Sequence, residues 1–276
     1  MAGFKRIFDF YLDASVHVAL AVLSLIHITA LTVNISIDIH LYGFIFFGTI
    51  CCYNFVKYGV EAHKYILVAN RYHKNIQFFS FVCSLIAGYH AFFLTEKVFL
   101  GLLILGGVTA FYALPVLPKH RNFRSLSGLK IIIVALVWSG TTVLLPVYAV
   151  SGHFENHIKL EALQRFILVL VLLIPFEIRD LKYDHKDLKT LPQRLGTRGA
   201  RRIGYVWVLL FCMITYFKSD IGLVAIITDT IFSGLLIVAL YGTKTIRSKY
   251  YASFWVEALP LVYWVLVVIS TRITNF

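Results

Sequence analysis

The chain has 276 residues, of which 59% are hydrophobic and only 14% are charged, and its mean hydropathy is +0.79. Soluble domains carry about 25% charged and roughly 45–50% apolar residues, so the composition excludes a soluble domain and predicts an all-α, polytopic membrane protein. The 26 Lys and Arg residues outnumber the 14 Asp and Glu residues, but they lie between apolar segments. We therefore assign the positive charge to cytoplasmic loops and expect no nucleic-acid partner.

Apolar windows recur along the whole chain, and a membrane-spanning helix needs roughly 20 such residues. The windows lie at about 14–33, 39–56, 75–94, 98–118, 131–150, 160–177, 202–217, 221–241 and 251–271. Glu161 and Arg165 interrupt the sixth window near one end. The sequence thus predicts a single transmembrane domain over residues 1–276 with about nine helices, although eight or ten also fit the pattern.

The charges of the loops predict the orientation of these helices. Of the 26 Lys and Arg residues, 21 lie before the first window or in every second loop. The positive-inside rule places those segments in the cytoplasm. We therefore expect a cytoplasmic N-terminus, an outside C-terminus and a cytoplasm-facing polar cap made by loops 57–74, 119–130 and 178–202. The expected membrane is the cytoplasmic (inner) membrane of a bacterium.

The most informative polar segment follows the sixth window, at residues 174–196. If the helix continues through this segment at 100° per residue, four carboxylates share one stripe of its surface. They belong to Glu177, Asp180, Asp184 and Asp187. Like charges four residues apart destabilise a helix, so a cation should compensate them. One interpretation is Mg²⁺ held by carboxylates and substrate phosphate oxygens; the other is a solvated loop neutralised by its own Arg and Lys residues.

The segment from Arg179 to Gly196 resembles a signature of the UbiA superfamily of intramembrane prenyltransferases, RDxxxDxxxGxxTLPxRLG. It contains Arg179, Asp180 and Asp184, followed by TLPQRLG at 190–196. The spacer is one residue shorter here, and Asp187 stands near the usual Gly. The layout of nine helices with this motif after the sixth is also similar. The resemblance implies a UbiA-like helical bundle, Mg²⁺ at the three aspartates and a prenyl diphosphate substrate.

The other signature of that family, NDxxDxxxD at the end of the second helix, is degenerate. Asn54 matches its Asn, but Phe55, Tyr58 and Ala62 stand where acids are expected, and Lys57 adds a positive charge. In the family, as the resemblance implies, both motifs hold Mg²⁺ ions that grip the diphosphate while its C–O bond ionises. Either cations such as Lys57 hold the diphosphate directly, or this branch has lost the reaction.

The resemblance and the charges together give a set of candidate residues for binding the diphosphate or substrate. They are Asn54, Lys57, Tyr58, Lys119, Arg121, Arg179, Lys182 and Arg194. Lys119 and Arg121 follow Tyr112, where the family often has a Tyr before a Lys-Arg pair. Asp229, near the middle of the eighth window, is expected to line a cavity, and the alternative is a buried hydrogen-bonding role.

Two functions stay open. The first is a Mg²⁺-dependent prenyltransferase that moves a prenyl group from a prenyl diphosphate to an aromatic or lipid acceptor. The second is a non-catalytic membrane protein that keeps the UbiA fold for a lipid-binding or structural role. A transporter is disfavoured because the sequence has no clear internal repeat or paired broken helices. The sequence assigns no catalytic residue.

Overall fold

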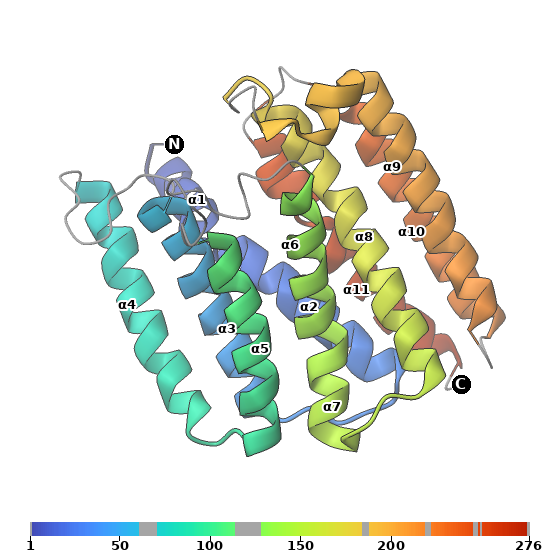
Figure 1. Cartoon of the computed structure of the whole chain (residues 1–276), viewed down its shortest axis with the longest axis horizontal. Helices are drawn as coiled ribbons and strands as arrows, with labels where there is room; N and C mark the ends of the chain where they lie inside the picture. Colours follow the sequence, from blue (N-terminus) through green and yellow to red (C-terminus); the bar gives the residue numbers. More distant parts are fainter. Residues whose placement is uncertain are drawn as a thin grey trace.

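The computed structural model describes residues 2–60, 71–113, 128–183, 188–218, 222–244, 248 and 250–274. Within these ranges the chain is helical and has no β-strand, which confirms the all-α fold class (Figure 1). The helices are α1 (Ala2–Asp13), α2 (Val16–Thr32), α3 (Ile39–Asn54), α4 (Arg71–Ala91), α5 (Glu96–Ala113), α6 (Leu129–Ser139), α7 (Leu145–Ser151), α8 (Asn156–Asp180), α9 (Leu191–Phe217), α10 (Leu223–Gly242) and α11 (Leu259–Thr274).

Among the described residues, three π-helical turns extend or join these helices. They are η1 (Phe55–Val60) after α3, η4 (Gly140–Leu144) between α6 and α7, and η6 (Tyr251–Val256) before α11. In the described part of the chain, five helical rods are long and apolar enough to cross a membrane, or six if α1 and α2 count as one span bent by 55°. Each of the nine predicted windows contains a helix, so the membrane-helix prediction is confirmed and the number nine is approximate.

The bundle has two distinct ends (Figure 1). The N-terminus, the start of α4, the end of α8 and the start of α9 lie at one end, which we name the polar end. The C-terminus and the connection from α4 to α5 lie at the other. The basic loops predicted to lie together therefore do lie at one end, as far as the described residues define it, and their cytoplasmic placement stays a prediction.

The largest hydrophobic core joins α2 with α8, α9, α10 and α11. Leu25, Leu168 and Phe211 are almost completely buried in it, and the Tyr263 ring stacks on the Phe232 ring at a centroid distance of 4.2 Å. Large apolar side chains also cover much of the outer surface, on every long helix from α4 to α11. A surface of this kind is stable in lipid rather than in water, which agrees with the membrane class.

Charged residues inside this bundle form a buried cluster around Arg165 on α8. The Arg165 guanidinium donates to the carbonyl of Leu25 (2.7 Å), to the hydroxyl of Thr29 (3.4 Å) and to Glu161 (3.4 Å). Glu161 also forms an ion pair with Lys218, which follows α9. The charges that interrupted the sixth window are therefore neutralised within the protein and link α2, α8 and the end of α9.

Gly196 marks a break near the start of α9. Its backbone has φ 68° and ψ 169°, a region that is essentially restricted to glycine. Thr190 and Gln193 form a capping box at the beginning of the same helix. The TLPQRLG motif thus folds as a capped helical turn that ends in a glycine-dependent bend.

Gly196→Ala is expected to lower the free energy of unfolding by about 1–3 kcal/mol, because alanine is strained in this backbone region. Gly106→Ala on α5 is the matched control, since a Cβ there meets no atom within 4 Å and the residue is helical. It should instead raise the stability by roughly 0.5–1 kcal/mol. Denaturation of both variants in detergent measures the two effects, and shifts of the same sign would contradict the account of Gly196.

Candidate functional site

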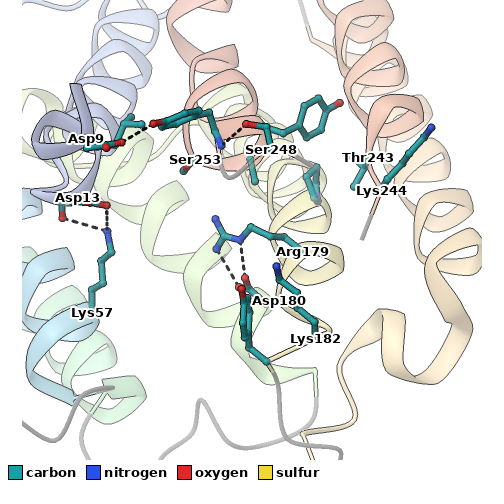
Figure 2. Close-up of a pocket in the computed structure, with 16 residues that line it drawn as sticks. Asp9, Asp13, Lys57, Arg179, Asp180, Lys182, Thr243, Lys244, Ser248 and Ser253 are labelled. Atoms are coloured by element: carbon teal, nitrogen blue, oxygen red, sulfur yellow. Dashed lines mark hydrogen bonds and ion pairs between the residues drawn. The ribbon is translucent and has the colours of Figure 1, made fainter. Parts of the chain in front are cut away.

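A polar cavity of about 590 Å³ opens at the polar end of the bundle (Figure 2). It is lined by α1, η1, the end of α8 and the segment from α10 to η6. Its charged lining residues are Asp9, Asp13, Lys57, Arg179, Asp180, Lys182 and Lys244. Four cations and three carboxylates give this polar cavity a formal charge of +1, so it suits an anionic ligand with room for a cation.

One wall of the polar cavity is the end of α8. Arg179 Nε donates to Asp180 Oδ1 (2.7 Å) and Nη2 donates to Oδ2 (3.3 Å), so the two side chains are paired in a fixed geometry. Lys182 also lines this wall, and its Nζ lies 4.5 Å from the centre of the Tyr183 ring. The structure therefore brings Arg179, Asp180 and Lys182 of the predicted site to one cavity.

The predicted stripe of four carboxylates requires a correction. It assumed that the helix continues, but α8 ends at Asp180, whose carbonyl accepts a hydrogen bond from the Tyr183 N–H (2.8 Å) in the following turn. Glu177 is buried and pairs with Lys130 (3.2 Å) instead of facing the polar cavity. Asp184 and Asp187 lie outside the described residues.

The opposite wall comes from α1, whose carboxylates the sequence analysis missed. Tyr250 donates to Asp9 (2.8 Å), and Tyr72 donates to Asp13 (2.9 Å). Partial burial and this contact with Asp13 raise the pKa of Tyr72, which keeps its hydroxyl protonated as a donor. The i,i+4 spacing of the two aspartates was the available signal, because it places both on one face of a helix. The hydropathy pattern instead predicts that residues 1–13 precede the first span.

The residues at the degenerate first motif contact the bend between α1 and α2, at residues 13–15. Asn54 is buried and accepts a hydrogen bond from Ser15 Oγ (2.7 Å), while Tyr58 donates to the first carbonyl of the bend (3.0 Å). Neither belongs to the lining of the polar cavity, whereas Lys57 does. Lys57 Nζ lies 3.7 Å from the carboxylate at the start of the bend. Of the three candidate residues at the first motif, Asn54 and Tyr58 therefore contact the bend instead of lining the polar cavity, and only Lys57 lines it.

Two of the other predicted residues lie elsewhere, and two cannot be placed. Arg194 lines a second, apolar cavity between α6, α8 and α9, away from Asp180. Asp229 is buried and accepts hydrogen bonds from Tyr263 (2.7 Å) and Thr215 (2.6 Å), which matches the alternative of a buried partner for hydroxyl groups. Lys119 and Arg121 lie outside the described residues.

The described side chains do not by themselves form a complete metal site. No group of three His, Cys, Asp or Glu side chains within the described ranges is placed to hold a metal ion. Proteins commonly bind Mg²⁺ through only one or two carboxylates together with the phosphate oxygens of a substrate. Asp180, in the wall of the polar cavity beside three lysines, fits that kind of incomplete site.

The whole chain is similar to known structures of one fold. No family model and no curated protein matches its sequence. An apo UbiA homologue from Aeropyrum pernix K1 superposes with a TM-score of 0.66 at 11% identity, covering 94% of this chain and 98% of that one. A UbiA homologue from Archaeoglobus fulgidus bound to DMAPP and Mg²⁺ gives 0.59 at 14% identity, covering 95% and 99%.

A third structure, a digeranylgeranylglyceryl phosphate synthase, gives a TM-score of 0.55 at 14% identity and covers 98% of both chains. At such identities the similarity establishes the fold. The Arg179-Asp180 pair stands at the end of α8 and the TLPQRLG segment begins the next helix, in the order of the sequence motif. The chain therefore has the UbiA fold.

Proposed function

We propose that the protein is a Mg²⁺-dependent, UbiA-like prenyltransferase that binds a prenyl diphosphate in the polar cavity. The prenyl group would pass to an aromatic or lipid acceptor. The observation that carries this proposal is the polar cavity itself, where the motif residues Arg179 and Asp180 meet Lys57 and two further lysines. The fold is shared with a UbiA homologue bound to DMAPP and Mg²⁺, which supports the same ligand class.

In this proposal the chain's own charges hold the leaving group. Asp180, with Asp184 and Asp187 expected beside it, would hold Mg²⁺, which neutralises charge on the diphosphate. Lys57 and Lys182 add positive charge from opposite walls, and preorganised charges of this kind stabilise a developing anion strongly in a low-dielectric site. Arg179 orients Asp180 through its paired hydrogen bonds.

Breaking the C–O bond sends its electron pair to the diphosphate and leaves an allylic cation. Tyr183, Tyr250 and Tyr251 belong to the lining of the polar cavity, and aromatic faces attract such a cation. The charge of the loops places this end of the bundle in the cytoplasm, in our proposal at a bacterial inner membrane. A diphosphate donor would then enter from the aqueous side.

A non-catalytic role is the alternative, and one observation favours it. Asn54 and Tyr58, at the positions of the first acidic motif, are engaged with the bend between α1 and α2. Lys57 contacts Asp13 twice: its Nζ lies near the Asp13 carboxylate and donates to the Asp13 backbone carbonyl (3.2 Å). Because these residues are engaged within the protein, such a site would bind the phosphate of a lipid without breaking its C–O bond.

Mg²⁺ together with geranyl diphosphate is expected to stabilise the detergent-solubilised protein against heat. A ligand at 100 times its dissociation constant adds about 2.7 kcal/mol. Lys57→Ala should weaken this binding by about 1.5–3 kcal/mol, the typical worth of a hydrogen bond to a charged group. Lys74→Ala is the matched control, because Lys74 is an exposed lysine near the start of α4 that does not line the polar cavity.

The release of diphosphate in the same samples separates the two functions. Release with an aromatic or lipid acceptor, reduced in Lys57→Ala but not in Lys74→Ala, supports the enzyme. Stabilisation without any release supports the non-catalytic role. If geranyl and longer prenyl diphosphates leave the melting temperature unchanged in the presence of Mg²⁺, the polar cavity is not a prenyl diphosphate site.

A further inference from the structure

The second cavity is a groove of about 350 Å³ between three helices. Its floor is α8, with Phe166 and Leu170, and its walls are α6, with Ile131 and Ile132, and α9, with Trp207. α6 and α9 both pack against α8 and hardly touch each other, so the groove lies between them (Figure 1). The groove is therefore an apolar channel bounded by three helices of a membrane bundle.

Two cations stand at the mouth of this groove. Lys189 precedes the capping residue of α9 and Arg194 lies in its first turns, and both line the groove with exposed side chains. Lys189 adopts the left-handed backbone conformation, with φ 44°, which is costly for a residue other than glycine. The mouth thus carries positive charge above an otherwise apolar lining.

The floor of the groove lies about one lipid leaflet away from the end of α8. Leu170 and Phe166 lie 10 and 14 residues before the end of α8 at Asp180. At 1.5 Å per residue, the floor is about 15–21 Å from the polar end. A bilayer core is about 30 Å thick, so one leaflet is about 15 Å. The distance from the end of α8 to the floor is therefore comparable to the thickness of one leaflet.

We propose that this groove binds one anionic phospholipid from the leaflet at the polar end. Its acyl chain would lie along α8 against Phe166 and Trp207, and its phosphate would sit between Lys189 and Arg194. A long apolar channel with cations only at its mouth matches the division of a phospholipid into chain and headgroup. Anionic headgroups are favoured by about fivefold for each nearby Lys or Arg.

This lipid site is independent of the proposed prenyl transfer. Among the described residues, the groove and the polar cavity share no lining residue. It also gives Arg194, which the sequence motif assigned to the diphosphate, a different ligand of related chemistry. A free phosphate ion would meet the same two cations but would leave the apolar channel unused.

Trp207 provides the test, because bromine atoms on an acyl chain quench tryptophan fluorescence only at short range. The full chain is reconstituted in phosphatidylcholine vesicles with a small fraction of phosphatidylglycerol, and either lipid carries the bromine. Comparison with Trp207→Phe isolates the Trp207 signal. Brominated phosphatidylglycerol should quench Trp207 more than brominated phosphatidylcholine at the same mole fraction, and excess inorganic phosphate should not remove the difference.

The variants separate a built site from general attraction to basic residues. Lys189→Gly removes one cation and also relieves the strained backbone, so it should fold at least as well while its preference for phosphatidylglycerol falls by about fivefold. Arg194→Gln should lower the preference similarly. Arg198→Gln is the control, because Arg198 is exposed on α9 and does not line the groove.

Three results would overturn the proposal. They are equal quenching by the two brominated lipids in the wild type, an equal loss of preference in Arg198→Gln, and abolition of the preference by inorganic phosphate.

Discussion

Arg165→Met is expected to lower the free energy of unfolding by about 3–5 kcal/mol, the usual cost of breaking a buried ion pair. Arg165 is 2% exposed and its guanidinium binds Glu161 and the Leu25 carbonyl. Methionine has a similar length but no donor, so these acceptors lose a partner inside the bundle. Chemical denaturation in detergent, followed by circular dichroism, measures the loss.

Lys159→Met is the control for this variant. Lys159 lies on the same helix, but it is exposed and its described contact is with Asn156 on the adjacent turn. Its replacement should change the stability by no more than about 0.5 kcal/mol. If both variants unfold alike, the cluster around Arg165 contributes nothing specific to the bundle.

Asp180→Asn is expected to reduce Mg²⁺-dependent binding of geranyl diphosphate by about 100-fold or more, because losses of residues that merely support a metal ligand already cost 10–100-fold. The stability of the ligand-free protein should change little, since asparagine retains an oxygen that accepts from Arg179. Isothermal titration with geranyl diphosphate, with and without Mg²⁺, measures the effect.

Asp9→Asn makes the same change of charge in the same polar cavity, on the wall formed by α1. Because Asp9 lies outside the motif and the ligand is anionic, removal of its charge should leave binding unchanged or strengthen it. The expected result is weaker binding in Asp180→Asn and no weakening in Asp9→Asn. Equal weakening in both would mean that Asp180 acts only through the general charge of the polar cavity.

The fold class could be predicted from the sequence because a hydropathy window and a sequence motif each depend only on residues close together in the chain. The windows and the RD…TLPQRLG segment each depend on neighbours in sequence, and the helices and the UbiA fold agree with them. Arg165 was visible only as an interruption of a span. Arg165 and Glu161 are four residues apart, but Arg165 also binds the carbonyl of Leu25, 140 residues away, and Glu161 binds Lys218, 57 residues away. No local pattern contains these distant partners.

The site was predicted mainly on one wall, and Lys57 is the one predicted residue on the other. Arg179, Asp180 and Lys182 follow from the motif, but Asp9 and Asp13 belong to a short amphipathic helix that hydropathy does not detect as a span. The packing of α1 against η1 and η6 brings these carboxylates to the polar cavity, and this packing is a tertiary effect. The same effect explains why Arg194, close to Arg179 in sequence, faces another cavity.

The bend between α1 and α2 has a consequence for acidic substitutions at position 58. The hydroxyl of Tyr58 donates to the carbonyl of Asp13, and the carboxylate of Asp13 lies beside Lys57. An aspartate at position 58 would remove that donor and place a second negative charge next to Asp13. An acidic residue at this single position is therefore destabilising unless α1 changes as well, so the contact of Tyr58 with the bend disfavours an acidic first motif in this chain.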